Sequence, residues 1–341
     1  MENIAHSLAG VCIARAGFTE KVTPRAAFWT GLAAANLPDV DLLTYPLLGQ
    51  EAYLLHHRGI THSLLALALV PPLVAWIARR FSSSSSFPAL WFLAFLAYAS
   101  HLAMDLPTSW GTMLLLPFSD VRFAADWVFI VDLMFWVILS IPFWLGRFVP
   151  IQSVQLNRIT LLFLGAYVGL CGFCHEMALK KVAEAAKAQE IEVTELHAYP
   201  AAFLPVVWNG VAGDSVFWHQ GGIQLLGGHG QALNRKIARN LDQRAVAAAI
   251  QTPIGKRFVT WWANAPYAEV RCVGERRWVV LRDLRLENPW LGLAGFQLAI
   301  EMSRENKSSP WEARSRRWIS WFLGKSLPEA DCLNLHNSAD P

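Results

Sequence analysis

Long apolar runs separated by short polar segments occupy the first half of the chain. Their lengths are typical of helices, and the last two approach the roughly twenty residues that cross the hydrocarbon core of a bilayer. Because the earlier runs are shorter, we expect tilted or half-inserted helices that pack together. The pattern predicts a mainly α fold, a polytopic helical membrane bundle of about six short helices over residues 1–178. The expected helices are 4–16, 26–37, 63–77, 88–105, 126–146 and 159–177.

The pattern changes after Glu176. Residues 180–195 are charged and rich in alanine, which favours a helix that continues out of the membrane. Beyond them, short β-branched and aromatic runs between turn residues predict an antiparallel sheet in a small soluble α+β domain, residues 179–330, before a frayed tail, 331–341. The expected strands are 206–208, 215–218, 257–262, 268–273, 278–286 and 295–302.

Two further helices are expected in this second half. Residues 233–250 have helical spacing, and residues 311–323 form an amphipathic basic segment that could lie on anionic lipid or cap the domain. The tryptophans of this half could pack in a core or rest at the membrane surface, and core packing is favoured. The Gly-rich segment 221–230 lacks the glycine order of a nucleotide-binding loop, so it is interpreted as a hairpin.

Composition supports the membrane interpretation. Hydrophobic residues make up 54% of the chain and charged residues only 16%, with a mean hydropathy of +0.30, which exceeds the usual values of a soluble globule. The formal net charge of +3 is dispersed, so nucleic acid is not an expected partner. The five cysteines are an odd number without the spacing of a secreted domain. Cys171 and Cys174 lie in an apolar run and are interpreted as packing residues rather than a redox pair.

Ionisable residues gather at the ends of the apolar runs. Residues 38–41 read PDVD, residues 56–63 read HHRGITHS, and His101 and Asp105 share one face of an expected helix. The first segment lacks the features of a cleaved signal peptide, so His6 should remain available. Ionisable groups beside hydrocarbon are functional candidates because a bare charge there is costly. Imidazoles and carboxylates together suit zinc or another first-row divalent ion.

Positive charges set the expected orientation. Cytoplasmic loops of membrane proteins carry an excess of Lys and Arg. The basic residues lie after the first, third and fifth helices and are Arg15, Lys21, Arg25, Arg79, Arg80, Arg147 and Arg158. The opposite ends carry every candidate ligand. We therefore expect a multi-pass protein of a bacterial-type inner membrane, with the metal site and the C-terminal domain on the non-cytoplasmic face.

The order of these motifs resembles a known family. An N-terminal His, PDxD, HRGxTHS, HxxxD and a Gly-Thr turn with Pro-Phe-Ser are similar to the YdjM-type family of membrane-bound metal-dependent hydrolases, here in a long form with a soluble tail. That family is distantly similar to the zinc phospholipase C and P1 nuclease group, all-helical enzymes whose multi-zinc sites cleave phosphoesters. The resemblance covers about the first half of the chain, and it rests on His6, Asp39, Asp41, His57, Arg58, Gly59, Thr61, His62, Ser63, His101, Asp105, Gly111, Thr112, Pro117, Phe118 and Ser119.

The favoured hypothesis is a hydrolase of a phosphoester, with a lipid or lipid-linked substrate. Roughly one to three divalent ions, zinc being favoured, would activate water and polarise the phosphoryl oxygen. Asp41 or Asp39 would take the proton from the attacking water, and Arg58 would hold the substrate phosphate. The expected metal ligands are His6, Asp39, Asp41, His57, His62, His101 and Asp105.

Several alternatives stay open. His101 and Asp105 could be an ordinary helix pair, His6 a water-facing histidine at a helix end, and Arg58 a structural partner of an aspartate. The roles of His56 and Asp132 are undecided. The chain could also be an ion-handling transporter, or a structural or regulatory membrane protein that a metal stabilises.

Overall fold

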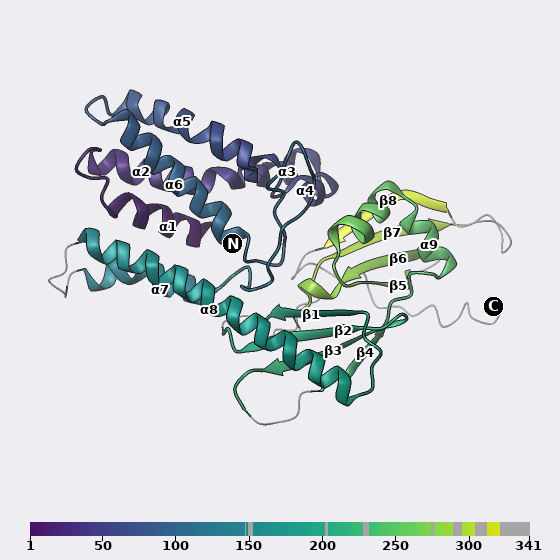
Figure 1. Ribbon diagram of the computed structural model, residues 1–341. Helices are drawn as coiled ribbons and strands as arrows, with labels where there is room; N and C mark the ends of the chain where they lie inside the picture. Colours follow the sequence, from purple (N-terminus) through teal and green to yellow (C-terminus); the bar gives the residue numbers. More distant parts are fainter. Residues whose placement is uncertain are drawn as a thin grey trace. The chain divides into compact units, whose positions relative to one another are not determined.

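The computed structural model describes residues 1–146, 148, 153–201, 204–227, 232–273, 276–288, 295–303 and 312–320. It forms two compact units (Figure 1). The first is helical and comprises Met1–His175, and the second comprises Glu176–Ala201 and the described residues from Val206 onward.

The helices of the first unit largely follow the apolar pattern. Three of the described helices, α5, α6 and α8, are long and apolar enough to span a membrane, and α7 is a shorter apolar helix. The first two helices are short, as predicted, but the third and fourth were expected to be short as well and are long enough to span a membrane. The six main helices are α1 (Asn3–Arg15), α2 (Pro24–Asn36), α5 (Leu64–Phe81), α6 (Phe87–Asp105), α7 (Leu133–Leu145) and α8 (Ser153–Ala188).

Small residues let α1 and α2 approach closely. A Cβ added to Gly10 would lie 2.3 Å from the Gly31 carbonyl oxygen, so neither position has room for a side chain. The Thr23 side chain accepts a hydrogen bond from the Ala26 amide and caps α2, and Pro24 occupies its first turn. Helix α6 packs against α1, α2 and α5, so its ligand-bearing end faces the other motifs.

The helix expected at 126–146 begins later than predicted. Helix α7 starts at Leu133, and Asp132 caps it by accepting a hydrogen bond from the Met134 amide at 2.8 Å. The preceding residues are held outside any helix because the Trp127 and Val128 amides both donate to the Pro107 carbonyl oxygen. An apolar run cannot by itself distinguish such a segment from a helix.

Short helices that the pattern did not reveal connect α2 to α5. A 3₁₀ helix, η1 (Leu37–Leu43), leads into α3 (Thr44–Leu48) and α4 (Gln50–His56), and a second 3₁₀ turn, η2 (Ile60–His62), precedes α5. The polar motifs therefore lie on tight turns between helices. These turns are what bring their side chains together.

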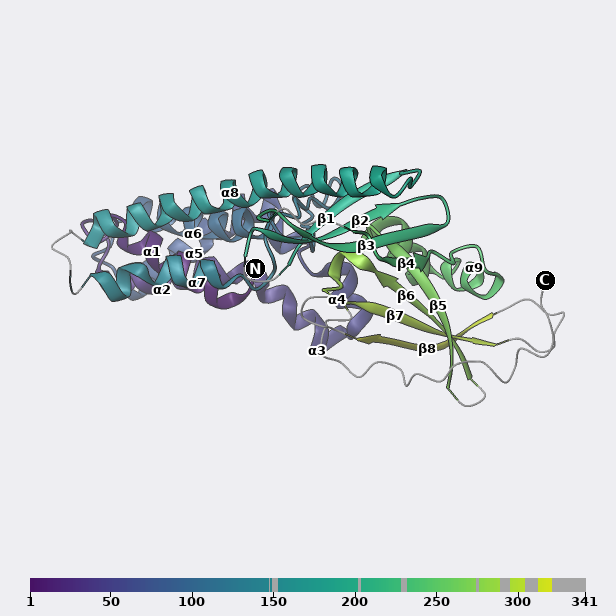
Figure 2. The same ribbon diagram turned by 90° about the horizontal axis from the view of Figure 1, so that it is seen from below.

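The second unit contains two four-stranded antiparallel sheets rather than one. Their orders follow the chain, β1-β2-β3-β4 and β5-β6-β7-β8, as expected for hairpin connections. Helix α8 runs unbroken from the first unit into the second, which confirms the predicted continuation as far as Ala188, whereas Glu195 already begins a strand (Figure 2). The strands are β1 (Glu195–Pro200), β2 (Val207–Gly213), β3 (Phe217–Gln224), β4 (Arg235–Ala238), β5 (Pro266–Val273), β6 (Arg276–Asp283), β7 (Gln297–Ser303) and β8 (Glu312–Ser320).

Three element assignments in this unit were wrong. Residues 233–250 contain β4 and the short helix α9 (Arg244–Ile250), and residues 257–262 are helical, because α10 (Pro253–Arg257) continues into a π-helical turn, η3 (Phe258–Trp262). The Thr252 side chain accepts from the Gly255 amide and starts that helix.

The third error is the basic segment at 311–323, whose described residues form β8, the last strand of its sheet. Charged residues are common on such an edge because they discourage pairing with other chains. Residues 311, 321–323 and the expected tail, 331–341, lie outside the described residues.

The core of the second unit confirms the packing role of its tryptophans. Trp208, Trp218 and Trp262 are among the largest fully buried side chains. Cys171 and Cys174 are buried and free, consistent with packing.

Candidate metal centre

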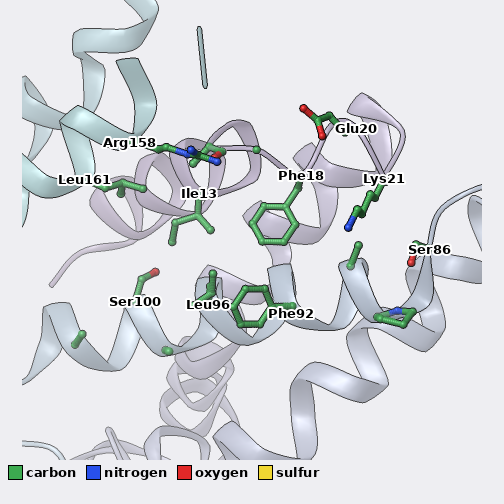
Figure 3. A pocket seen from close by; sticks show the side chains of 16 residues that line it. Ile13, Phe18, Glu20, Lys21, Ser86, Phe92, Leu96, Ser100, Arg158 and Leu161 are labelled. Atoms are coloured by element: carbon green, nitrogen blue, oxygen red, sulfur yellow. The ribbon is translucent and has the colours of Figure 1, made fainter. Parts of the chain in front are cut away.

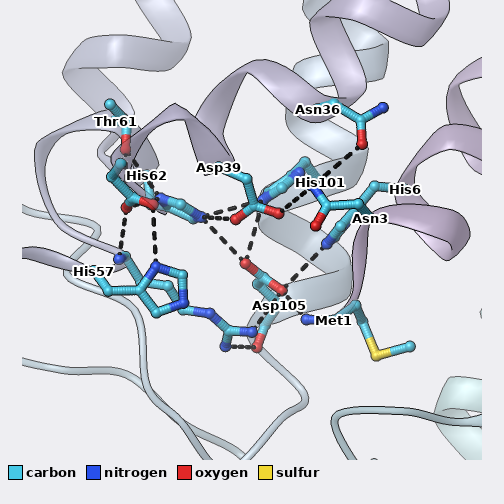
Figure 4. Close-up of polar contacts among 12 residues, drawn as sticks. Met1, Asn3, His6, Asn36, Asp39, His57, Thr61, His62, His101 and Asp105 are labelled. Atoms are coloured by element: carbon cyan, nitrogen blue, oxygen red, sulfur yellow. Dashed lines mark hydrogen bonds and ion pairs between the residues drawn. The ribbon is translucent and has the colours of Figure 1, made fainter. Parts of the chain in front are cut away.

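Four motifs that are far apart in the sequence meet at one end of the first unit (Figure 4). Helix α1 supplies His6, η1 supplies two aspartates, the η2 region supplies two histidines, and the last turns of α6 supply His101 and Asp105. The side chains form two overlapping groups whose ligand atoms lie within 4.8 Å of one another in each group. The first group is Asp39, His62, His101 and Asp105, and the second is Asp39, Asp41 and His57.

The first group brings nitrogen lone pairs face to face. The Nε2 atoms of His62 and His101 are 3.1 Å apart, and each lies 3.3 Å from Asp105 Oδ2. Asp39 Oδ1 lies 3.5 Å from His62 Nε2 and 3.6 Å from His101 Nε2. His101 Nδ1 lies 2.6 Å from the Ala35 carbonyl oxygen, which can accept its proton and leave Nε2 as the donor of a lone pair. With its proton on Nδ1, His101 can bind a metal ion through the lone pair of Nε2.

The second group is organised around Asp41. Its Oδ1 lies 3.0 Å from His57 Nδ1, and its Oδ2 accepts hydrogen bonds from the Arg58 amide at 2.8 Å and the Thr61 hydroxyl at 3.2 Å. Burial alone would raise the pKa of Asp41, but the contacts with His57 and His62 hold it below its usual range. The carboxylate is therefore ionised and firmly oriented.

His6 is buried, so the water-facing alternative for this residue is wrong. Its ring stacks on His101 with centroids 3.6 Å apart, and its Nε2 lies 3.5 Å from Asp105 Oδ1. Both ring nitrogens of His6 and the Oδ2 of Asp105 are buried without a hydrogen-bond partner. Unpaired buried donors and acceptors are costly, and a bound cation would satisfy these lone pairs.

Arg58 is also part of the cluster and is only 1% exposed. Its Nη2 lies 2.9 Å from Asp105 Oδ1, and its Nη1 donates to the Thr108 hydroxyl at 2.6 Å. Asp105 Oδ1 additionally contacts the terminal ammonium group of Met1. The ion pair with an aspartate, one of the two roles considered for Arg58, is thus present.

His56 and Asp132 lie outside both groups. His56 is exposed at the end of α4, and Asp132 accepts a hydrogen bond from the Tyr167 hydroxyl at 2.8 Å besides capping α7. The sequence analysis missed the aromatic walls of the site. Tyr53 stacks on His57 at 4.6 Å between ring centroids, and Trp110 meets the same ring edge-on at 5.6 Å. The motifs gave no signal for them, because neither aromatic residue belongs to the His and Asp motifs.

The donor set fits a divalent metal ion. Imidazole nitrogens and carboxylate oxygens converge in a buried volume, one histidine has its tautomer fixed, and several lone pairs have no protein partner. Zinc, manganese and iron all bind imidazole nitrogens and carboxylate oxygens, so this donor set suits each of these metals.

Comparisons with known proteins agree with this picture. The inner membrane protein YbcI of Escherichia coli (strain K12) is 33% identical over 147 residues, which are 42% of this chain and 79% of that protein. The uncharacterized protein YfhP of Bacillus subtilis (strain 168) is 32% identical over 88 residues, 26% of this chain and 27% of that protein. No solved structure matches the chain. The YdjM inner membrane protein family matches residues 1–178, the part that carries the whole cluster, and the chain therefore belongs to this family of inner membrane proteins.

Proposed function

We propose that the protein is a membrane-bound metal-dependent hydrolase that cleaves a phosphoester with metal-activated water. The observation that carries this proposal is the convergence of His62 and His101 nitrogens on the carboxylates of Asp39 and Asp105 in a buried site. Asp39 belongs to both ligand groups, so its carboxylate is shared between them. Paired ions suit the displacement of a phosphoester, because they stabilise both the attacking and the leaving oxygen.

Residues of this chain would orient the reaction. Bound divalent ions supply a water of lowered pKa and a Lewis acid at the phosphoryl oxygen. Asp41, fixed by the Arg58 amide and Thr61, is the proposed acceptor of the water proton. The Tyr53 and Trp110 rings pack on His57 and exclude solvent from that side. Arg58 would stabilise charge at the phosphate only by giving up part of its contact with Asp105.

A lipid or lipid-linked substrate is supported by the surface beside the ligands. Val40 lies between the two aspartates of η1 and is 45% exposed, and the adjoining α3 has no buried residue. Its Leu47 and Leu48 side chains are even more exposed. Exposed apolar side chains of a membrane protein favour contact with acyl chains. Such a surface would place the head group of a lipid near the ions.

The direct test combines metal analysis with an activity panel. The purified full-length protein should retain at least one divalent ion per chain and cleave a phosphodiester or phospholipid. A chelator should abolish cleavage, and the removed metal should restore it. Metal-loaded protein that cleaves none of the phosphoesters tested would contradict the hydrolase proposal and favour the alternative that follows.

The second candidate is a membrane protein whose metal only stabilises the helices. The engagement of Arg58 with Asp105 and Thr108 favours this view, because a group that is fully used inside the fold is less available to a substrate. A transporter would need a further set of polar groups along its path. Metal exchange between the two sides of sealed vesicles would support transport, and its absence together with cleavage would support the enzyme.

The proposed orientation puts the cluster and the second unit on the non-cytoplasmic face. Lys and Arg at the opposite ends of the helices support it. A cysteine introduced at Ser84 should be shielded from an impermeant thiol reagent applied outside, and one introduced at Ser303 should react. The reverse labelling pattern would place the metal centre in the cytoplasm.

A further inference from the structure

A large cavity lies in the first unit away from the metal ligands (Figure 3). Its volume is about 920 Å³, and its walls come from the end of α1, the loop after it, one face of α6 and the start of α8. Along α6 the lining runs from Pro88 to Ala103, a span of about 22 Å of helix. The hydrocarbon core of a bilayer is about 30 Å thick, so this lining is longer than a single leaflet of the core.

The walls are apolar for most of this length. Phe18 and Phe92 meet with ring centroids 6.0 Å apart, and Leu96 and Leu161 continue the lining. Ala99 and Ala103 leave width on the α6 side because their side chains are small. An apolar groove on membrane-spanning helices is a surface that acyl chains can fill without losing contact with the bilayer.

Two cations occupy the loop side of the same cavity. Lys21 follows α1, and Arg158 lies on the first turns of α8, where its Nε donates to the Ala16 carbonyl oxygen at 2.7 Å. Within the described parts of the chain neither side chain has a carboxylate partner. In the view of Figure 3 both lie opposite α6, and Lys21 extends toward Phe92. Glu20 lines the same side of the cavity, with its carboxylate pointing away from that ring.

We propose that this cavity binds one anionic glycerophospholipid, with an acyl chain along α6 and the phosphate between Lys21 and Arg158. The positive charges of the two side chains attract the negative phosphate, and the apolar part of the lining begins next to them. By the distribution of basic residues this head group belongs to the cytoplasmic leaflet. The site is therefore separate from the metal centre and independent of the reaction proposed there.

The test measures lipid retention by native mass spectrometry of the full-length protein in detergent. Phosphatidylglycerol should bind as one copy and more tightly than phosphatidylcholine with the same acyl chains. In the variant Lys21→Ala/Arg158→Ala the preference for phosphatidylglycerol should fall by about tenfold to hundredfold, since hydrogen bonds to charged groups are lost. The matched control Arg79→Ala/Arg80→Ala removes two basic residues of α5 that do not line the cavity, and it should keep the preference.

A second variant tests the groove without touching charge. Ala99→Phe puts a ring into the lining and should lower retention of both lipids, while metal content stays at the wild-type level. Equal lipid retention in the wild type, in Lys21→Ala/Arg158→Ala and in Ala99→Phe would overturn the proposal. A loss of preference in the Arg79/Arg80 control as large as in the Lys21/Arg158 variant would overturn it too, because the effect would then be one of general surface charge.

Discussion

Each unit of the molecule contains a cluster of mostly buried ionisable side chains, but the two clusters differ in what they leave unpaired. In the second unit Glu287 lies 2.8 Å from Arg235 Nη1 and 3.6 Å from Arg282 Nη1, and it accepts a hydrogen bond from the Tyr267 hydroxyl. Gln297 lies against the same Arg282. Opposite charges therefore face one another, and each makes hydrogen bonds inside the cluster.

The cluster of the first unit has ligand atoms in excess of cations. It contains three aspartates and four histidines but two cations, Arg58 and the terminal ammonium group of Met1, and both ring nitrogens of His6 have no hydrogen-bond partner. Buried polar side chains are common, so burial alone does not mark a site. What marks one is a set of lone pairs that the protein does not satisfy.

The largest expected effect is the loss of metal from α6 variants. His101→Ala and Asp105→Ala should each weaken metal binding by at least about 100-fold, since the loss of a group that merely orients a ligand already costs about 10- to 100-fold. The protein should stay in the membrane, because the apolar helices do not depend on the ion. Metal analysis of the purified variants measures the effect. His56→Ala is the matched control, and full occupancy of His101→Ala or Asp105→Ala would exclude α6 from the site.

A smaller effect is expected from the balanced cluster of the second unit. Glu287→Gln keeps the shape of the side chain but removes the charge that faces Arg282, which is buried. We expect a loss of about 2 kcal/mol of unfolding free energy, the value of a hydrogen bond to a charged group. Thermal unfolding of the full-length protein measures it, and metal content should be unchanged. A drop in bound metal would show that the two clusters are not independent.

A substitution of Arg58 tests whether the cluster of the first unit is a catalytic site or a metal site that only stabilises the helices. Arg58→Lys keeps the charge near Asp105 but loses the planar fork that also reaches Thr108. Because these contacts are internal, we expect a lower melting temperature and about tenfold weaker metal retention, with turnover per metal-loaded molecule unchanged. Phosphodiester cleavage, metal stoichiometry and melting temperature are measured on the same preparation. Intact metal with turnover at least about tenfold lower would instead assign Arg58 to the substrate phosphate.

The sequence predicted most of the first unit because its helices are both apolar and periodic. The polar motifs were predictable as a set, since costly residues beside membrane helices are few. What could not be predicted was determined by contacts between distant segments. Residues 127–131 are as apolar as the helix that follows, but hydrogen bonds from the Trp127 and Val128 amides to the Pro107 carbonyl oxygen keep them out of it. Similarly, Arg58 adopts φ +59°, a conformation that no local pattern signals.

The second unit was less predictable for a related reason. Its strands are short, and an amphipathic segment such as 312–320 has spacing that fits a helix until a sheet edge is available to pair with it. Whether such a segment becomes a strand depends less on its own residues than on the strand with which it can pair. The helix after Thr252 is determined locally, because the Thr252 side chain accepts a hydrogen bond from the Gly255 amide and so caps the first turn.

The smallest expected effect concerns an ion pair near the surface of the second unit. Asp214 Oδ2 lies 2.9 Å from His219 Nε2, and Oδ1 accepts hydrogen bonds from the Val216 and Phe217 amides. Burial would raise the pKa of Asp214, but the His219 contact and the two amides lower it to about 2. Since its usual value is about 4, the ionised group stabilises the fold fully above pH 4 and loses this contribution as the pH falls toward 2.

Asp214→Asn isolates that charge because the amide oxygen can still accept from the two backbone amides. At pH 6 the substitution should lower the free energy of unfolding by less than about 1 kcal/mol, because water and salt screen this ion pair. Thermal unfolding of both proteins between pH 6 and pH 3 should show the difference shrinking as the wild-type carboxylate takes up its proton. A difference that stays constant over this range would mean that the charge of Asp214 contributes nothing, and that only the geometry of the turn matters.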